Sequence, residues 1–231
     1  MVLNRSHHPY ATKNGPDVPI FSIRGYCHRM PERRNSATNP ELLAAALFDV
    51  AAESGLDNAS VREVAKSAGV SIGAVQHHFS TKDEMLAFAL RTLVDRLLTR
   101  LPDAGSGTGP HRELFDALSQ LLPLDEQRGR EVHVLSAFAV RAATNSALAE
   151  IRRTFLFTAR TALSGALIGV GTPEAETRAA LLLATVNGLA LDAVSNPSMY
   201  PADYLTYALE TQIRLTLHDA DISRPSTDLV G

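Results

Sequence analysis

Residues 60–86, SVREVAKSAGVSIGAVQHHFSTKDEML, decide the fold because they hold two short helical segments separated by a sharp turn. Ser60 is placed to cap a helix over residues 61–68, and Ser71 is placed to cap a second one. Between them, Gly69 can adopt the left-handed turn conformation without steric cost. Two short helices joined in this way indicate a helix-turn-helix, whose second helix projects from the domain.

The flanking segments extend this unit into a small domain. Asn39 suits a helix cap, apolar residues then recur at helical spacing, and Gly55 supplies the stop. After the motif, residues 80–83 begin a fourth helix that runs to about Leu101, with acids in its first turn as the helix dipole prefers. We therefore predict a three-helix head over residues 39–82 and a long helix that links it to the rest.

Helical periodicity continues beyond a glycine-rich stretch at residues 102–110. It predicts five more helices, over about residues 111–122, 126–144, 146–169, 173–195 and 201–218. The expected fold class is all-α, with a helix-turn-helix head and a helical body over residues 83–219, followed by a disordered tail over residues 220–231.

The predicted helix at 173–195 is apolar on nearly every side, so it needs cover on both faces. Its own core can cover one face and a second subunit the other. The helix at 201–218 is its natural partner, and a four-helix bundle formed by two copies would bury both helices. We therefore expect a homodimer through these two helices.

Composition limits the possible functions. The 231 residues carry a net charge of −3, so any binding to DNA must come from a local surface. The sequence shows no apolar run near the ~20 residues that a membrane span needs, and no secretory signal. The single cysteine, Cys27, suits a reducing compartment. These features predict a cytoplasmic protein that does not enter the membrane.

Residues 1–38 contain several prolines and glycines and no sustained periodicity, which predicts a flexible N-terminal extension. Six basic residues face two acidic ones there, a local excess of +4. The extension could lie along DNA phosphates or in a minor groove, or it could be a solvated tail.

The motif resembles the DNA-binding signature of the TetR family of transcriptional regulators. The matching positions are Ser60, Val64-Ala65, Ala68-Gly69-Val70-Ser71, Gly73, His78-Phe79 and Lys82, with support from the preceding helix. The resemblance implies a DNA-binding head, a ligand-binding body, dimerisation through the last two helices, and repression that a small molecule releases. It implies no catalysis, no cofactor and no metal. Gln76 stands where the family often has tyrosine, and Ala51 replaces a common phenylalanine.

The expected partner of the head is a palindromic site in double-stranded DNA, with phosphate contacts setting the register and base contacts setting the sequence. We expect Ser60, Ser71, His77 and Lys82 to contact phosphates, and Ile72, Ala74, Gln76 and also His77 to meet base edges. The small Gly73 would let the backbone of the second motif helix approach the DNA closely. His78 reads more simply as a packing residue.

The body is expected to hold the effector in an apolar site with a few polar groups. The candidate residues are Phe88, Phe115, Leu118, His133, Phe138, Arg141, Phe155, Thr158 and Asn187. Each phenylalanine could instead be a plain core residue. Arg141 could bind an anionic effector, or it could pair with an acid such as Glu150 at the surface. An effector that moves the fourth helix would move the heads.

Two other classes of function compete with this one. An enzyme is disfavoured because residues 105–109 lack the spacing of a phosphate loop and the chain lacks the common hydrolase motifs. His77 and His78 are adjacent on a helix and point about 100° apart, so they cannot share a metal ion. The alternative of a helical interaction protein without DNA binding draws on the head's charge of −2, from three basic and five acidic residues over 39–82.

Overall fold

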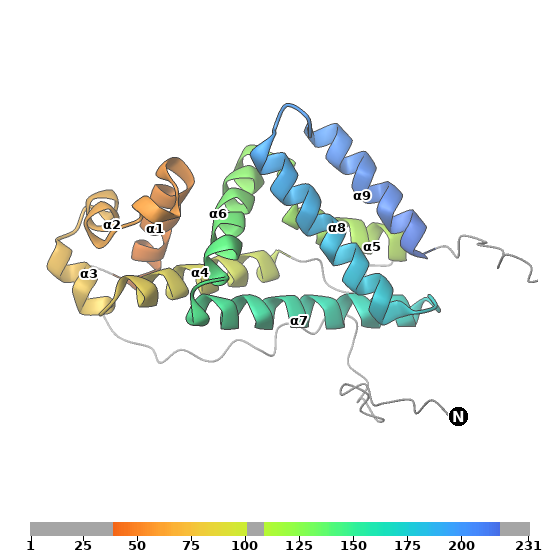
Figure 1. Ribbon diagram of the computed structural model, residues 1–231, viewed down its shortest axis with the longest axis horizontal. Coiled ribbons are helices and arrows are strands. Elements are labelled where there is room, and N and C mark those ends of the chain that lie inside the picture. The colour runs from red at the N-terminus through yellow and green to blue at the C-terminus, as the bar shows by residue number, and fades with distance from the viewer. Residues whose placement is uncertain (1–38, 101–108, 218–231) are drawn as a thin grey trace, which may run out of the picture.

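The computed structural model describes residues 39–100 and 109–217, and within them every regular element is a helix (Figure 1). The helices are α1 (Pro40–Ser54), α2 (Val61–Ala68), α3 (Ile72–His78), α4 (Lys82–Thr99), α5 (Pro110–Leu118), α6 (Glu126–Ala142), α7 (Ser146–Gly169), α8 (Ala175–Ser195) and α9 (Ala202–Leu217), with short 3-10 turns η2 (Leu56–Asn58) and η3 (Ser119–Leu121). The all-α prediction is confirmed. The proposed basic extension, most of the glycine-rich stretch, Cys27 and the tail lie outside the described residues.

The helix boundaries follow from local capping chemistry. Asn39 Oδ1 accepts from the backbone N–H groups of Glu41 and Leu42 and so starts α1. Side chains do the same at the starts of α2, α3, α4, α6 and α7. Each cap satisfies one of the free N–H groups at a helix start, so a short polar side chain before an apolar run suffices to place the helix.

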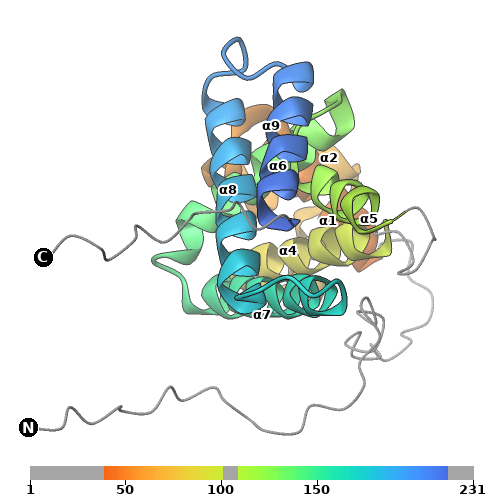
Figure 2. The same cartoon turned by 90° about the vertical axis from the view of Figure 1, so that its right-hand side faces the viewer.

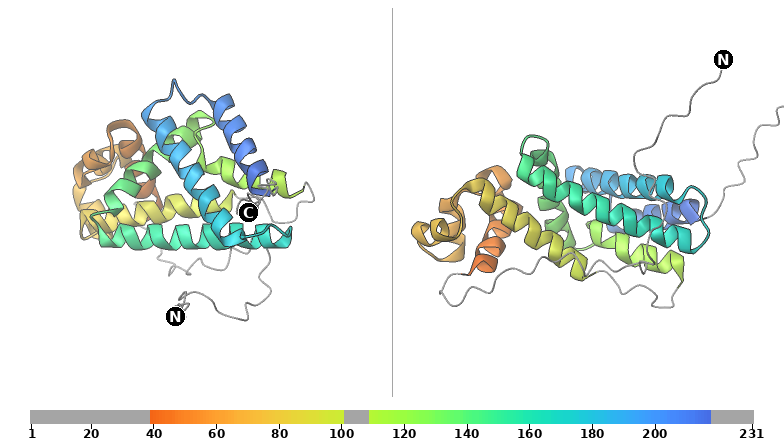
Figure 3. Two further views of the ribbon diagram at one scale, coloured as in Figure 1. Left: turned by 45° about the vertical axis from the view of Figure 1, so that its right-hand side comes forward. Right: turned by 90° about the horizontal axis from the view of Figure 1, so that it is seen from below.

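The helices form a small head and a larger body, joined by a long α4 (Figures 1 and 3). The head comprises α1, α2 and α3, and its core continues without a break into α4, the C-terminal half of α6 and the start of α7. A second core lies among α5, α7, α8 and α9. The head is therefore packed against the body through a shared core and is not joined to it by a flexible linker alone.

At the far end of the body, α8 and α9 lie side by side (Figure 2). Arg178 Nη1 on α8 donates to the carbonyl of Thr216, 2.8 Å away in the last turn of α9, where a cation suits the helix dipole. Contrary to the sequence expectation, α8 is long and apolar enough to span a membrane by length and composition. Its inner residues pack on α6, α7 and α9, as the core helix of a helical protein does.

Candidate DNA-binding face and ligand cavity

The turn between α2 and α3 fixes the direction in which α3 leaves the head. Gly69 has φ +67° and ψ 30°, the left-handed conformation that glycine adopts readily. The Val70 N–H then bonds the carbonyl of Ala65 at 2.9 Å, and Ser71 Oγ accepts from the Ala74 N–H at 3.1 Å to start α3. Val75 is fully buried against the head core. One face of α3 is thus anchored and the opposite face is presented to solvent.

The outward face of α3 carries most of the residues that the sequence predicted to contact DNA. Ser71, Ile72, Gly73, Gln76 and His77 are exposed, and Ala74 is half-buried beside them. Ile72 is a large apolar side chain with 41% of its surface exposed, so it is available for contact on this face.

His78 is half-buried and lies edge-on to His77, with ring centroids 5.4 Å apart.

Gly73 has no intramolecular reason to be glycine. It lies inside α3 with ordinary helical dihedrals, where glycine is less favourable than alanine by roughly 0.5–1 kcal/mol. A Cβ built on it would meet only Ser71 Oγ, at 3.9 Å. The space above Gly73 is therefore empty in the isolated chain.

Two further predicted phosphate ligands lie at helix starts and already hold internal hydrogen bonds. Ser60 Oγ accepts from the Glu63 N–H at 3.2 Å, which leaves its own hydroxyl hydrogen free to donate. Lys82 Nζ donates to the Asp57 carbonyl at 2.9 Å and ties the start of α4 to η2. An ammonium group has three N–H donors, so this bond leaves Lys82 able to meet an anion as well.

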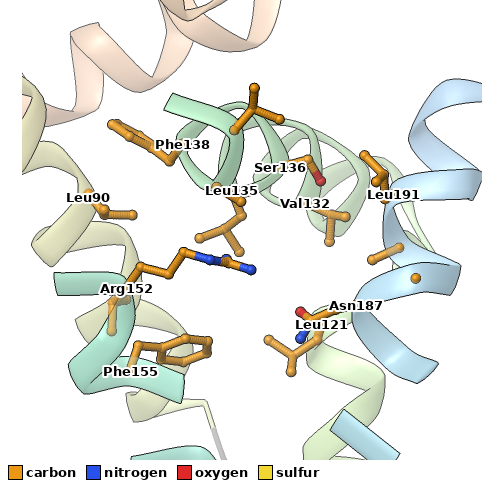
Figure 4. Close-up of a pocket in the computed structure, with 15 residues that line it drawn as sticks. Leu90, Leu121, Val132, Leu135, Ser136, Phe138, Arg152, Phe155, Asn187 and Leu191 are labelled. Carbon is orange, nitrogen blue, oxygen red and sulfur yellow. The ribbon is translucent and has the colours of Figure 1, made fainter. Parts of the chain in front are cut away.

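A cavity of about 360 Å³ lies between α4, η3, α6, α7 and α8 and opens to solvent where the exposed Val140 and Leu191 form its rim (Figure 4). Its wall is mostly apolar, and its charged or hydrogen-bonding side chains are Arg152, Ser136 and Asn187. The lining residues are Leu90, Val94, Leu121, Val132, Leu135, Ser136, Phe138, Ala139, Val140, Arg152, Phe155, Asn187, Gly188, Ala190 and Leu191. A small-molecule site in a protein has this size and this mixture of apolar wall and sparse polar groups.

Three of the ligand residues predicted from the sequence meet in this cavity, namely Phe138, Phe155 and Asn187. The other candidates lie elsewhere. Phe88 packs against Phe79 of the head, Phe115 lies beneath Arg112, Leu118 is in the second core, His133 is exposed, Arg141 lies at the head, and Thr158 is half-buried on α7.

The cavity's one arginine, Arg152, was not among the predicted residues. Arg152 lies one helical turn before Phe155, which was predicted to bind the ligand. This spacing places both side chains on the same face of the helix, and it is the signal that could have identified Arg152.

Two ion pairs join α6 to the head. Arg130 reaches Asp49 on α1 with an N–O distance of 2.8 Å, and Arg141 reaches Asp57 on η2 at 3.0 Å. The sequence left Arg141 open between an anionic effector and a surface pair with Glu150, and it pairs instead with an acid of the head. Exposed pairs of this kind contribute little to stability.

An apolar face remains uncovered on α8 and α9. Large side chains with about half or more of their surface exposed include Leu181, Leu191, Tyr204, Tyr207 and Leu215. Apart from Glu176 and Asp192, the exposed residues of α8 recur at 177, 181, 184, 188, 191 and 195, alternate steps of four and three that form one stripe along the helix.

Among the described residues, no group of three or more His, Cys, Asp or Glu side chains is placed to hold a metal ion.

Comparison with known proteins agrees with both halves of this architecture. A family model described as bacterial regulatory proteins, tetR family, matches residues 42–88. A second model, described as BetI-type transcriptional repressor, C-terminal, matches residues 110–218. The HTH-type transcriptional regulator PksA of Bacillus subtilis is 31% identical over 173 residues, which are 73% of this chain and 84% of that protein.

Solved structures agree as well. A transcriptional regulator from Rhodococcus sp. Rha1 has 73% identity and a TM-score of 0.75, covering 78% of this chain and 96% of that one. A transcriptional regulator from Saccharomonospora viridis in complex with choline shares the fold, with a TM-score of 0.65 at 18% identity, over 76% of this chain and 95% of that one. These relatives are described as transcriptional regulators. The helix-turn-helix head, the helical body and the matches to both show that this chain belongs to the TetR family of DNA-binding transcriptional regulators.

Proposed function

We propose that the chain is a homodimeric repressor that reads a palindromic DNA site with α3 and leaves it when a small molecule fills the body cavity. The observation that carries the proposal is the outward face of α3, where an exposed isoleucine, a glutamine and a histidine surround a glycine that folding does not require. Ile72 and Ala74 would meet thymine methyl groups, and Gln76 an adenine edge or a phosphate. Ser60, Ser71, His77 and Lys82 would hold phosphates. Such a regulator would act in the cytoplasm, where bacterial DNA lies.

The substitution Gly73→Ala should affect stability and DNA affinity in different ways. The added methyl group meets open space in the free protein, so we expect the free energy of unfolding to stay the same or to rise by about 0.5 kcal/mol. It also fills the space through which DNA would approach, so operator affinity should fall about 10- to 100-fold. Urea unfolding measures the first effect and fluorescence anisotropy with labelled duplex the second.

Gly165→Ala is the matched control for this experiment. Gly165 also lies within a helix, and a Cβ there meets nothing within 4 Å, whereas a Cβ on Gly73 would have one ordinary contact at 3.9 Å; Gly165 is on α7 in the body. We expect the same small gain in stability and no change in DNA affinity. If both alanine variants bind DNA as the wild type does, α3 does not dock closely at Gly73 and the proposed face is wrong.

The uncovered stripe on α8 and α9 is the proposed dimer interface, as the sequence analysis expected. Two copies would place Leu181 and Leu191 of each subunit in a shared apolar bundle. A two-fold axis through this end leaves both heads free and allows the recognition helices to stand about 34–36 Å apart, as successive major grooves require.

The coupling between cavity and head is proposed to run through α6 as well as α4. The sequence analysis assigned it to the fourth helix alone. However, α6 lines the cavity with Val132, Leu135 and Ser136, and the same helix packs into the head core through the buried Val134 and Phe138. An effector that shifts α6 by a small amount would turn the head on the body, and a preference of a few kcal/mol for the turned state suffices to release DNA.

A further inference from the structure

Among the residues that the structure describes, no carboxylate pairs with Arg152, whose cationic side chain is directed into an apolar cavity. It comes from α7, and its side chain extends across the space between Leu90, Leu135 and Phe155 (Figure 4). The residue is half-buried, and its guanidinium forms no hydrogen bond or ion pair with any residue of 39–100 or 109–217. Burial alone lowers the pKa of this guanidinium from its ordinary value. Arginine nevertheless stays charged, so the chain carries an uncompensated positive charge at this site.

The neighbouring arginines of the body behave differently. Arg153 pairs with Glu150, Arg128 with Asp125, and Arg100 with the buried Glu131. In contrast, no aspartate or glutamate is among the residues that line the cavity. Removing a charge from water without a partner is unfavourable, so an unpaired arginine in such a place indicates that the partner arrives from outside.

The polar groups around Arg152 complement an anionic headgroup. The planar guanidinium can bond a carboxylate through two parallel N–H donors. Ser136 on α6 and Asn187 on α8 add a hydroxyl and an amide to the same cavity. The rest of the wall is supplied by leucine, valine, alanine and phenylalanine side chains, which favour an aliphatic or aromatic body.

From this geometry we infer that the effector is an amphiphilic carboxylate, with its carboxylate on Arg152 and its apolar body against Leu135, Val132 and Phe155. The inference rests on the proposed function, because it names the class of molecule that would release the repressor from DNA. It also separates this chain from any regulator whose effector is a cation, because a quaternary ammonium group would meet Arg152 with like charge.

Three ten-carbon probes that differ only in headgroup test this inference: decanoate, decan-1-ol and decyltrimethylammonium. Isothermal titration calorimetry on the full-length dimer, without DNA, measures the affinity of each. We expect decanoate to bind between about tenfold and a hundredfold more tightly than decanol, the usual contribution of a charge-assisted hydrogen bond, and the ammonium probe to bind most weakly.

Arg152→Met removes the charge and keeps an unbranched side chain. We expect this variant to bind decanoate no more tightly than decanol, while its affinity for decanol is retained. Its melting temperature should equal or exceed that of the wild type, because an unpaired cation has left an apolar cavity; a merely structural arginine would lower it. Arg153→Met is the matched control, since Arg153 is the adjacent arginine, is exposed and pairs with Glu150, and it should leave all three affinities unchanged.

Several outcomes would overturn the inference: no decanoate binding by the wild type, equal binding of decanoate and decanol, or decanoate binding that survives in Arg152→Met. The DNA affinity of the ligand-free protein is measured separately. A dimer that binds its operator but not decanoate contradicts only the effector class. A dimer that binds no DNA contradicts the proposed function, whatever the calorimeter shows.

Discussion

Replacing Leu181 with glutamate is expected to convert the dimer into monomers and to lower operator affinity by roughly 10²–10⁴-fold, the range that linked binding of two sites contributes. Leu181 is the second position of the exposed stripe of α8, with 60% of its surface uncovered in a single chain. In the proposed bundle it is buried against the partner subunit. A carboxylate there would have to be desolvated without a counter-charge, which the interface cannot tolerate. Because each head of a monomer binds its half-site alone, the gain in affinity from linking the two heads is lost.

Light scattering after gel filtration measures the oligomeric state, and anisotropy with labelled duplex measures affinity. Phe157→Glu is the matched control, because Phe157 has 59% of its surface exposed but belongs to α7 and not to the α8–α9 stripe. We expect Phe157→Glu to stay dimeric and to bind DNA normally. If Leu181→Glu remains a dimer, the interface is not the α8–α9 face.

The second large effect is expected at Phe138, which belongs to two parts of the structure at once. It is 2% exposed, it lines the cavity, and it packs in the core shared with α1 and α4. Phe138→Ala should lower the free energy of unfolding by about 3–5 kcal/mol, the usual cost of removing a buried phenylalanine. Since the lost contacts include those to the head, amide hydrogen exchange should accelerate in α1 and not only in α6.

Phe155 provides the comparison for this result. It also lines the cavity, but it is half-buried and lies outside the core shared with the head. Phe155→Ala should lose about half as much stability and leave exchange in α1 unchanged. Phe138→Leu, with an expected loss of about 1–2 kcal/mol, covers the case in which the alanine variant does not fold. Unchanged protection in α1 for both Phe138 variants would mean that this side chain does not couple cavity and head.

The head could be predicted from the sequence almost residue by residue. Its signals are local: Asn39, Ser60 and Ser71 cap the helix that follows each of them, and Gly69 turns the chain within a few residues. Helix ends in the body were equally accessible, because Asn145 and residues 171–173 interrupt the periodicity where α7 begins and ends. The prediction of a helix-turn-helix regulator is confirmed by the family matches.

The cavity was far less predictable, because its wall is assembled from α4, η3, α6, α7 and α8. Helical periodicity identifies which residues face the core. It does not show where the side chains of neighbouring helices leave a space between them. Phe88 and Phe138 illustrate the point. Both are phenylalanines on inward faces, and both pack near the head, yet only Phe138 lines the cavity.

Charged residues were harder still to assign. Arg141 and Arg152 are both half-buried arginines of the helical body, but only the fold shows that Asp57 pairs with Arg141 and that no acid among the described residues pairs with Arg152.

The most direct test of the central claim is selection of a binding site from a random-sequence duplex library. The full-length, ligand-free dimer is incubated with the library at near-physiological salt, and the retained duplexes are sequenced over successive rounds. The account predicts enrichment of one palindromic sequence whose half-sites lie about one helical turn apart, and loss of that enrichment in Gly73→Ala but not in Gly165→Ala. Retention without an enriched sequence, or no retention by a folded dimer, would contradict the claim that α3 reads a specific operator.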